Sequence, residues 1–356
     1  MKKKMLAMAL AGTMAALALT GCGSGKGSAA ASSAAETTAA ATTEAANSST
    51  ETEQTASAGD ASAWKPTKTI NIYCTHSAGG DTDYMARLLA KNLETELGVT
   101  VVVSNVAGSN GATCMQQYKD GPKDGYTFIA SNTAALNGNE VTGMVDFGYD
   151  AFEPVAVYGI QSGENLVVPA NAPYDDLQSL LDATKKNPGQ IKLGISTGGG
   201  VYIESAVLQN LGGAQFNVID EGDAATRLTA LLGGAIDVTS LPYSTAADYI
   251  KDGQLKSLCT LLSKAPTLLP DQKTASETIP ELKIDTEYVL LAPKGTDANA
   301  VAAVNAAIVN ISKTDEWKEA VNSYCYQDPY VLNVDDTIQN LKEQRDLFMS
   351  FKDFLK

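Results

Sequence analysis

Residues 69–104 read TINIYCTHSAGGDTDYMARLLAKNLETELGVTVVVS, and this stretch decides the fold. Residues 69–74 have the composition of a β-strand. Residues 81–97 place their apolar side chains on one stripe, which predicts an amphipathic helix that ends at Gly98. Residues 99–104 form an almost unbroken apolar run, which is typical of a buried parallel strand. The stretch therefore predicts the beginning of a parallel α/β sheet.

The alternation of strands and helices continues along the chain. A helix over 111–119 and a strand over 126–131 complete a βαβαβ unit with right-handed crossovers. A second unit is predicted from helices over 175–186, 201–211, 224–232 and 244–251 and strands over 191–195, 216–219, 236–241 and 255–262. A late segment follows, with a strand over 288–292 and helices over 298–312 and 334–351. Two units in tandem predict two lobes, and we expect the late segment to complete the first.

The N-terminus indicates export. Three lysines precede an apolar stretch over 5–19 that is too short to cross a bilayer, and a small-residue site ends at Cys22. This pattern resembles a bacterial lipoprotein signal, in which residues 1–21 are removed and Cys22 is lipidated. An ordinary secretory signal is the alternative and leads to the same compartment. We therefore predict a protein that is anchored by lipid to the cell membrane on its extracytoplasmic side.

Residues 22–63 are predicted to be a disordered tether. Ser, Ala, Thr, Gly and Glu dominate this segment, and it holds no aromatic or large aliphatic residue that could offset the entropy of ordering. The whole chain has 41 Asp and Glu against 26 Lys and Arg, a formal net charge of −15. Such an excess of negative charge argues against nucleic acid or an anionic membrane surface as a partner.

Patterns for catalysis, metals or cofactors are weak. The single histidine, His76, excludes a zinc site built from several histidines. Residues 194–198 match the G-x-S-x-G pattern of hydrolases, but no histidine follows Ser196, so that interpretation fails. Neither an enzyme nor a cofactor is predicted. The remaining cysteines have no C-x-x-C spacing, which leaves disulfides and buried free thiols both open: Cys74, Cys114, Cys259 and Cys325.

Glycine-rich loops stand where predicted strands end and helices begin. They are residues 77–80, 108–111, 196–200 and 221–223. In open α/β sheets, ligands bind beyond the carboxyl ends of the strands. Glycine lets backbone N–H groups approach a ligand, and a helix N-terminus adds a positive dipole end. A single loop of this kind would be a mere tight turn, but four at one edge predict a carboxylate site that needs no Arg or Lys.

The sequence resembles the tripartite tricarboxylate transporter substrate-binding proteins, also called Bug proteins. Residues 77–83, SAGGDTD, followed by Ala86-Arg87, are similar to the family segment A-A-G-G-x-x-D…A-R. Further similar pieces follow in order, and the series is more specific than any one of them: 101–105, 108–111, 124–127, 152–155, 187–189, 231–237, 269–271 and 292–296.

The resemblance implies an α/β fold of the two-lobed periplasmic-binding-protein kind, type II-like. Each lobe would be a mostly parallel sheet with helices on both faces. Lobe 1 would comprise residues 64–160 and 288–356 and lobe 2 residues 161–287, with crossings near 152–168 and 288–292. The implied function is to capture a small organic acid or amino-acid-like ligand between the lobes and deliver it to a multi-span permease. We expect a monomer.

The resemblance also implies ligand-binding residues, which bind largely through backbone amides. In lobe 1 they are Ser77, Ala78, Gly79, Gly80, Asp81, Asp83, Gly108, Ser109, Gly111, Ser131 and Asn132. In lobe 2 they are Ser196, Thr197, Gly198, Gly199, Gly200, Glu221 and Gly222. Because each lobe supplies half of the donors, the lobes are expected to close on the ligand.

Four positions depart from the family pattern: His76, Asp81, Glu204 and the pair 220–221. Added negative charge near the cleft disfavours a plain di- or tricarboxylate and favours a ligand with an amine or amide. Asp81 would then recognise that group, unless it only caps its helix. Glu204 and Asp220 could instead face solvent. An ABC-type binding protein for an amino acid or other small acid, or an extracytoplasmic enzyme that uses carboxylates, remains the alternative.

Overall fold

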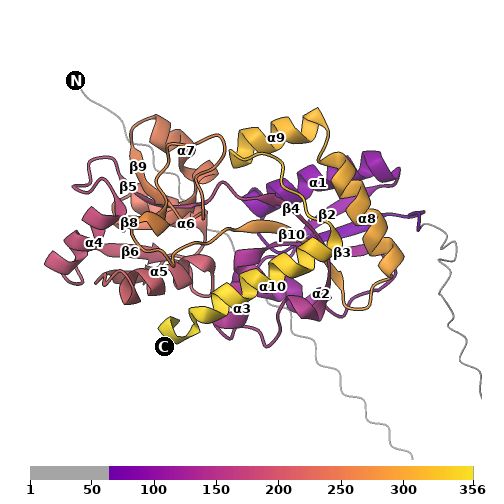
Figure 1. The fold of residues 1–356 in the computed structure, drawn as a ribbon, viewed down its shortest axis with the longest axis horizontal. Helices are drawn as coiled ribbons and strands as arrows, with labels where there is room; N and C mark the ends of the chain where they lie inside the picture. The colour runs from indigo at the N-terminus through magenta and orange to yellow at the C-terminus, as the bar shows by residue number, and fades with distance from the viewer. Residues whose placement is uncertain (1–63, 356) are drawn as a thin grey trace, which may run out of the picture. The chain divides into compact units, whose positions relative to one another are not determined.

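Two five-stranded sheets form the framework of the computed structural model, which describes residues 64–355 (Figure 1). Both sheets belong to one compact unit. The predicted signal peptide, the lipidation site Cys22 and the tether lie outside the described residues.

The first sheet has the strand order β2-β1-β3-β10-β4. Its strands are β1 (Ile70–Cys74), β2 (Val101–Asn105), β3 (Thr127–Asn132), β4 (Phe152–Ile160) and β10 (Glu287–Pro293). β1 pairs in parallel with β2 and β3, whereas β10 is antiparallel to both β3 and β4. Four strands therefore run in one direction, and β10 runs against them.

The second sheet repeats this arrangement in the order β7-β6-β8-β5-β9. Its strands are β5 (Glu164–Pro169), β6 (Lys192–Ile195), β7 (Asn217–Asp220), β8 (Val238–Pro242) and β9 (Leu255–Thr260). β5 is antiparallel to β8 and β9, and the other pairings are parallel. In each sheet the reversed strand is the one that follows a crossing from the other sheet. The predicted two-lobed α/β class with mostly parallel strands is confirmed.

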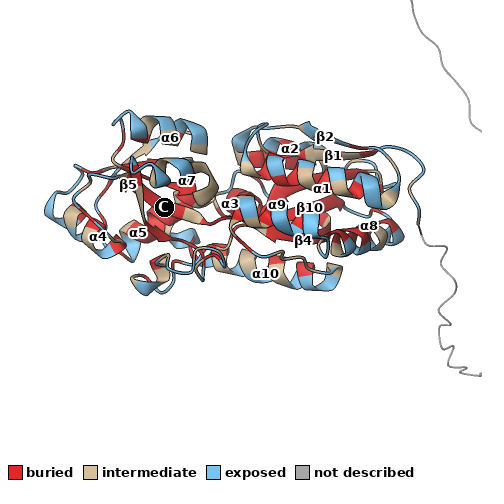
Figure 2. Cartoon of the chain, turned by 90° about the horizontal axis from the view of Figure 1, so that it is seen from above, coloured by how far each residue is buried: buried red, intermediate tan, exposed pale blue. Residues whose placement is uncertain are grey.

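Helices lie on both faces of the sheets, with buried residues along the strands and on the inward helix faces (Figure 2). They are α1 (Asp81–Leu97), α2 (Ala112–Tyr118), α3 (Thr133–Val141), α4 (Leu177–Lys186), α5 (Gly200–Asn210), α6 (Ala224–Leu232), α7 (Tyr243–Lys251), α8 (Ala298–Ile311), α9 (Asp315–Cys325) and α10 (Val334–Ser350). The predicted bounds of α1 and α6 are confirmed. α3 and α9 were not among the predicted helices.

The chain crosses between the sheets twice. The first crossing is short, because β4 ends at Ile160 and β5 begins at Glu164. It lies inside the expected range 152–168, most of which is strand. The return is completed just before Glu287, next to the expected range 288–292, which is part of β10 in the first sheet. The proposed lobe boundaries stay a prediction.

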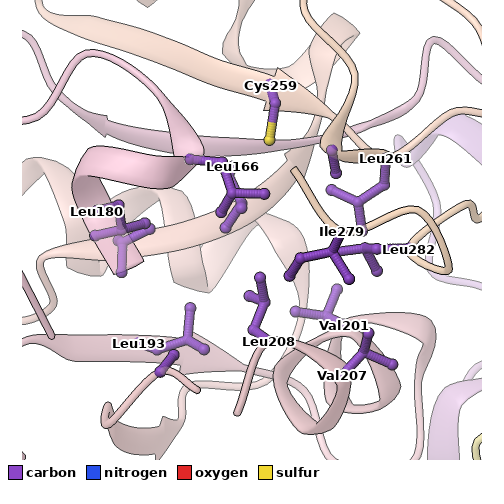
Figure 3. Close-up of a cluster of buried hydrophobic side chains, with 14 of the residues drawn as sticks. Leu166, Leu180, Leu193, Val201, Val207, Leu208, Cys259, Leu261, Ile279 and Leu282 are labelled. Atoms are coloured by element: carbon purple, nitrogen blue, oxygen red, sulfur yellow. The ribbon is translucent and has the colours of Figure 1, made fainter. Parts of the chain in front are cut away.

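Each sheet has its own apolar core. Around the second sheet, leucines from β5, α4 and β6 meet α5 and the segment that returns to the first sheet (Figure 3). Phe348 of α10 joins this cluster, although α10 also packs against α3 and β4 of the first sheet. In Figure 1 the yellow helix α10 runs from one sheet toward the other. The cysteines within residues 64–355 are buried free thiols, which settles the open question for Cys74, Cys114, Cys259 and Cys325.

Candidate functional site

A cavity of about 340 Å³ lies where the carboxyl ends of the parallel strands of both sheets meet. This volume falls within the usual range for small-molecule pockets. The first sheet contributes residues that follow β1, β2 and β3, and the second contributes residues that follow β6, β7 and β8. The two crossings add Gln161 and Thr286.

The structure brings part of the predicted site together around this cavity. The predicted residues that line it are Ser77, Asp81, Gly108, Gly111, Asn132, Ser196, Gly199 and Gly200. The predicted residues that do not line it are Ala78, Gly79, Gly80, Asp83, Ser109, Ser131, Thr197, Gly198, Glu221 and Gly222. Several of the second group hold the loops in place.

Asp83 fixes the loop between β1 and α1. Its Oδ2 accepts hydrogen bonds from the Gly79 amide at 2.9 Å and from Arg87 Nε at 3.0 Å, and its Oδ1 accepts one from Asn105 Nδ2 at 2.7 Å. Although burial alone would raise the pKa of Asp83, these donors lower it below the ordinary value. Asp83 therefore positions the loop from which Ser77 reaches the cavity.

Asp81 begins α1 and lines the cavity. Its Oδ2 accepts hydrogen bonds from Gln161 Nε2 at 2.6 Å and from the Tyr288 hydroxyl at 3.1 Å. These partners belong to the first crossing and to β10, not to the first turn of α1. The helix-capping alternative for Asp81 is therefore not the arrangement that the structure has.

The neighbouring polar residues of the first sheet hold one another in place. The Thr75 hydroxyl lies 2.7 Å from His76 Nδ1 and donates to Ser131 Oγ at 3.1 Å. Asn132 caps α3, because its Oδ1 accepts from the Ala135 amide at 2.8 Å. Burial lowers the pKa of His76 below its ordinary value, although the nearby Asp81 opposes this effect.

The loop after β6 contacts the other side of the cavity. The carbonyl oxygen of Gly198 accepts a hydrogen bond from Asn110 Nδ2 at 3.2 Å, which joins the two lobes directly. Gly198 has φ +82°, a conformation that favours glycine. Thr197 donates to Asp220 at 2.6 Å, and Asp220 is exposed. The expectation that Asp220 faces solvent fits this position.

Arg227 is a lining residue that the sequence interpretation missed. It lies on α6 and is only 3% exposed. Its Nη1 donates to the Gly222 carbonyl at 2.6 Å and its Nη2 to the Ser240 carbonyl at 3.1 Å. The expected site without Arg or Lys is therefore wrong. The available signal was its position on α6, four residues before the buried Leu231, on the face that the helix buries.

Two glutamates complete the second-lobe side of the cavity. Glu204 is 1% exposed, so the solvent-facing alternative for it is wrong, and its Oε1 accepts from Ser240 Oγ at 2.5 Å. Burial raises the pKa of Glu204 to about 8. Glu164, at the start of β5, was also missed by the sequence interpretation, and burial raises its pKa to about 7.

Among residues 64–355, no cluster of three or more His, Cys, Asp or Glu side chains is arranged to hold a metal ion. Within the same part of the chain, no helix combines the length and the apolar character that a membrane crossing requires.

Comparison with known proteins identifies relatives. Residues 85–347 match the family model TctC, described as tripartite tricarboxylate transporter family receptor. Protein BugT of Bordetella pertussis is 28% identical over 280 residues, which cover 76% of this chain and 84% of BugT.

Solved structures share the fold. A periplasmic transporter has a TM-score of 0.72 and 25% identity, and the match covers 80% of this chain and 96% of that one. MatC from Rhodopseudomonas palustris with bound malate has a TM-score of 0.70 and 20% identity, with 82% and 100% covered. The matching family is described as a transporter receptor, so the prediction of a binding protein rather than an enzyme is confirmed. The chain belongs to the tripartite tricarboxylate transporter receptor family, and it is a solute-binding protein of that family.

Proposed function

We propose that the protein captures a small carboxylate-containing metabolite in the cavity between its lobes and delivers it to a multi-span membrane permease. The observation that carries this proposal is the cavity of about 340 Å³, to which both sheets contribute loops with glycine backbones. MatC with bound malate, and another Rhodopseudomonas palustris protein of the same fold with adipate, support a carboxylate ligand. Family membership favours a tripartite permease over the ABC-type alternative.

We further propose that the protein works as a monomer whose lobes close on the ligand. The lobes would be residues 64–160 with 288–356, and residues 161–287. The hydrogen bond from Asn110 to Gly198 supports a closed arrangement, because it joins loops of the two sheets. Closure would surround the ligand with donors from both lobes.

Stabilisation by ligand tests the proposed function. Small mono-, di- and tricarboxylates and amino acids are added one at a time, and thermal unfolding is followed by circular dichroism. A true ligand at about 100 times its dissociation constant should add about 2.7 kcal/mol to the free energy of unfolding. If no acid in the panel shifts the unfolding of a correctly folded sample, the proposal is wrong.

We also propose that Cys22 carries the lipid that anchors the protein, although it lies outside the described residues. Cys22→Ala should leave the chain unprocessed or release it from the membrane, because the thiol that accepts the lipid is gone. Fractionation with immunoblotting measures this, and Ser24→Ala serves as the matched control. A Cys22→Ala protein that is still cut and still membrane-bound would contradict the anchor.

A further inference from the structure

Three side chains on the second-lobe side of the cavity have unused hydrogen-bonding capacity. We call Glu164, Glu204 and Arg227 the Arg–Glu subsite; all three line the cavity. Arg227 Nε, Glu164 Oε2 and Glu204 Oε2 are each buried and have no hydrogen-bond partner among the described residues. Because buried polar groups are normally paired, such atoms around one cavity indicate a missing polar partner.

Arg227 has no carboxylate of the described chain in direct contact with it. Among residues 64–355, the other arginines pair with carboxylates: Arg87 with Asp83, and Arg345 with Glu140. No carboxylate oxygen of the described chain lies within ion-pair distance of Arg227. Two backbone carbonyls hold its Nη atoms and so fix the guanidinium, which leaves Nε–H as a donor. A ligand carboxylate is the natural acceptor for this donor.

The carboxyl groups of the cavity outnumber its permanent cation. Asp81, Glu164, Glu204 and Asp223 line it together with Arg227. A dicarboxylate would add like charge to this set and would bring no donor for the two glutamate oxygens. A ligand that carries both a carboxylate and an ammonium group would satisfy the donor and the two acceptors together.

We propose that the Arg–Glu subsite binds the amino-carboxylate end of a zwitterionic ligand. The ligand carboxylate accepts from Arg227 Nε, and the ligand ammonium donates to Glu164 Oε2 and Glu204 Oε2. This inference rests on the proposed function, because it narrows the ligand class of the same cavity.

Binding at the Arg–Glu subsite should change the protonation of its two glutamates. Because burial raises the pKa of Glu204 to about 8 and that of Glu164 to about 7, both hold protons for part of the time near neutral pH. A bound ammonium favours their carboxylate forms, so binding should release protons and strengthen as the pH rises through this range. A dicarboxylate should do the opposite and take protons up. The ionisable groups that face the two glutamates are Arg227, Asp81 and the neutral thiol of Cys259, with Asp220 and Asp223 acting on Arg227.

Titration calorimetry tests the proposal with matched probes. The pairs are propionate and L-alanine, succinate and L-aspartate, and glutarate and L-glutamate, and the members of each pair differ only in the α-amino group. Each is titrated in phosphate and in Tris, whose ionisation enthalpies differ, so that the number of protons released is measured. In at least one pair we expect the amino acid to bind tenfold more tightly than its partner and to release protons.

Variants assign the effect to the subsite. Glu204→Gln and Glu164→Gln should each reduce the preference for the amino acid by tenfold or more and diminish the proton release. Glu94→Gln, an exposed glutamate of α1, is the matched control and should change neither. The proton release of the unmodified protein needs no variant, so a variant that fails to fold leaves the test intact.

The outcomes separate the two proposals. Simple acids that bind as tightly as their amino partners, or that bind with proton uptake, would overturn the zwitterion subsite and leave the proposed function standing. Absence of binding by every probe pair and by the wider panel of acids would overturn both.

Discussion

Gly138→Leu should weaken ligand binding by about 30-fold, which corresponds to an overpacking cost of about 2 kcal/mol in the closed protein. Gly138 lies in α3, on the first-sheet side, and is buried. A Cβ at this position would lie 3.0 Å from the Gly198 carbonyl oxygen, with backbone atoms of Gly199 next in distance. A leucine side chain therefore cannot fit unless the loop after β6 moves away.

The effect should fall on closure and not on folding. Gly138 is an interior residue of α3, and leucine is a better helix former than glycine. The obstructing atoms belong to the opposite lobe and to its backbone, which cannot rotate away as a side chain can. Separation of the lobes relieves the overlap, and it also breaks the contact between Asn110 and Gly198. The ligand would then lose the donors of one lobe.

Titration calorimetry measures the loss of affinity, and small-angle scattering measures the loss of closure. When the acid that gives the largest thermal shift is added, the wild-type protein should become more compact, whereas the Gly138→Leu variant should not. Ala302→Leu is the control, because it adds leucine to an exposed position of α8. Wild-type affinity in Gly138→Leu, or an equal loss in Ala302→Leu, would contradict the role of this contact.

Local patterns predicted much of the fold. α1 was located from its apolar stripe and from Gly98, which has φ +69° and ends the helix. α3 was missed because its sequence, TAALNGNEV, contains glycine and asparagine and has no clear stripe. Its start depends on Asn132, whose side chain caps it, and its packing depends on α10, a helix nearly 200 residues later in the chain.

The difference between local patterns and long-range packing also separates the predicted parts of the site from the missed ones. The glycine loops follow strands, so a general rule for α/β sheets placed them at the cavity. Arg227 contacts Ser240 of β8, and Glu164 begins β5. The two residues come together at the cavity only because β5 lies next to β8 in the sheet. Neither residue stands in a recognisable motif, and such a meeting depends on long-range strand pairing that a local pattern does not encode.

Asp83→Ala should lower the free energy of unfolding by about 3 kcal/mol, because it removes a buried acceptor of charge-assisted hydrogen bonds and leaves its donors unpaired. The Asp83 carboxylate accepts from the Gly79 amide, from Arg87 and from Asn105, and the residue is 4% exposed. Asp83→Asn should not rescue this loss, because an amide NH₂ would face these donors. Urea unfolding measures both variants.

The pH dependence gives a second measure of the same interaction. The donors lower the pKa of Asp83 below its ordinary value of 3.8. A carboxylate with a lowered folded-state pKa stabilises the fold above its ordinary pKa, and this contribution disappears as the pH falls through the folded-state value. The stability difference between wild type and Asp83→Ala should therefore be constant near neutral pH and shrink below about pH 4.

Asp248→Ala is the matched control for Asp83→Ala. Asp248 has a side chain that is 92% exposed and a distant ion pair with Lys251, so its loss should change stability by less than about 1 kcal/mol. The two roles considered for Asp83 make opposite predictions. Loss of stability without ligand present indicates that Asp83 holds the loop between β1 and α1. Unchanged stability together with weakened binding would contradict that role and make Asp83 a ligand-binding residue, as the resemblance to the family implies.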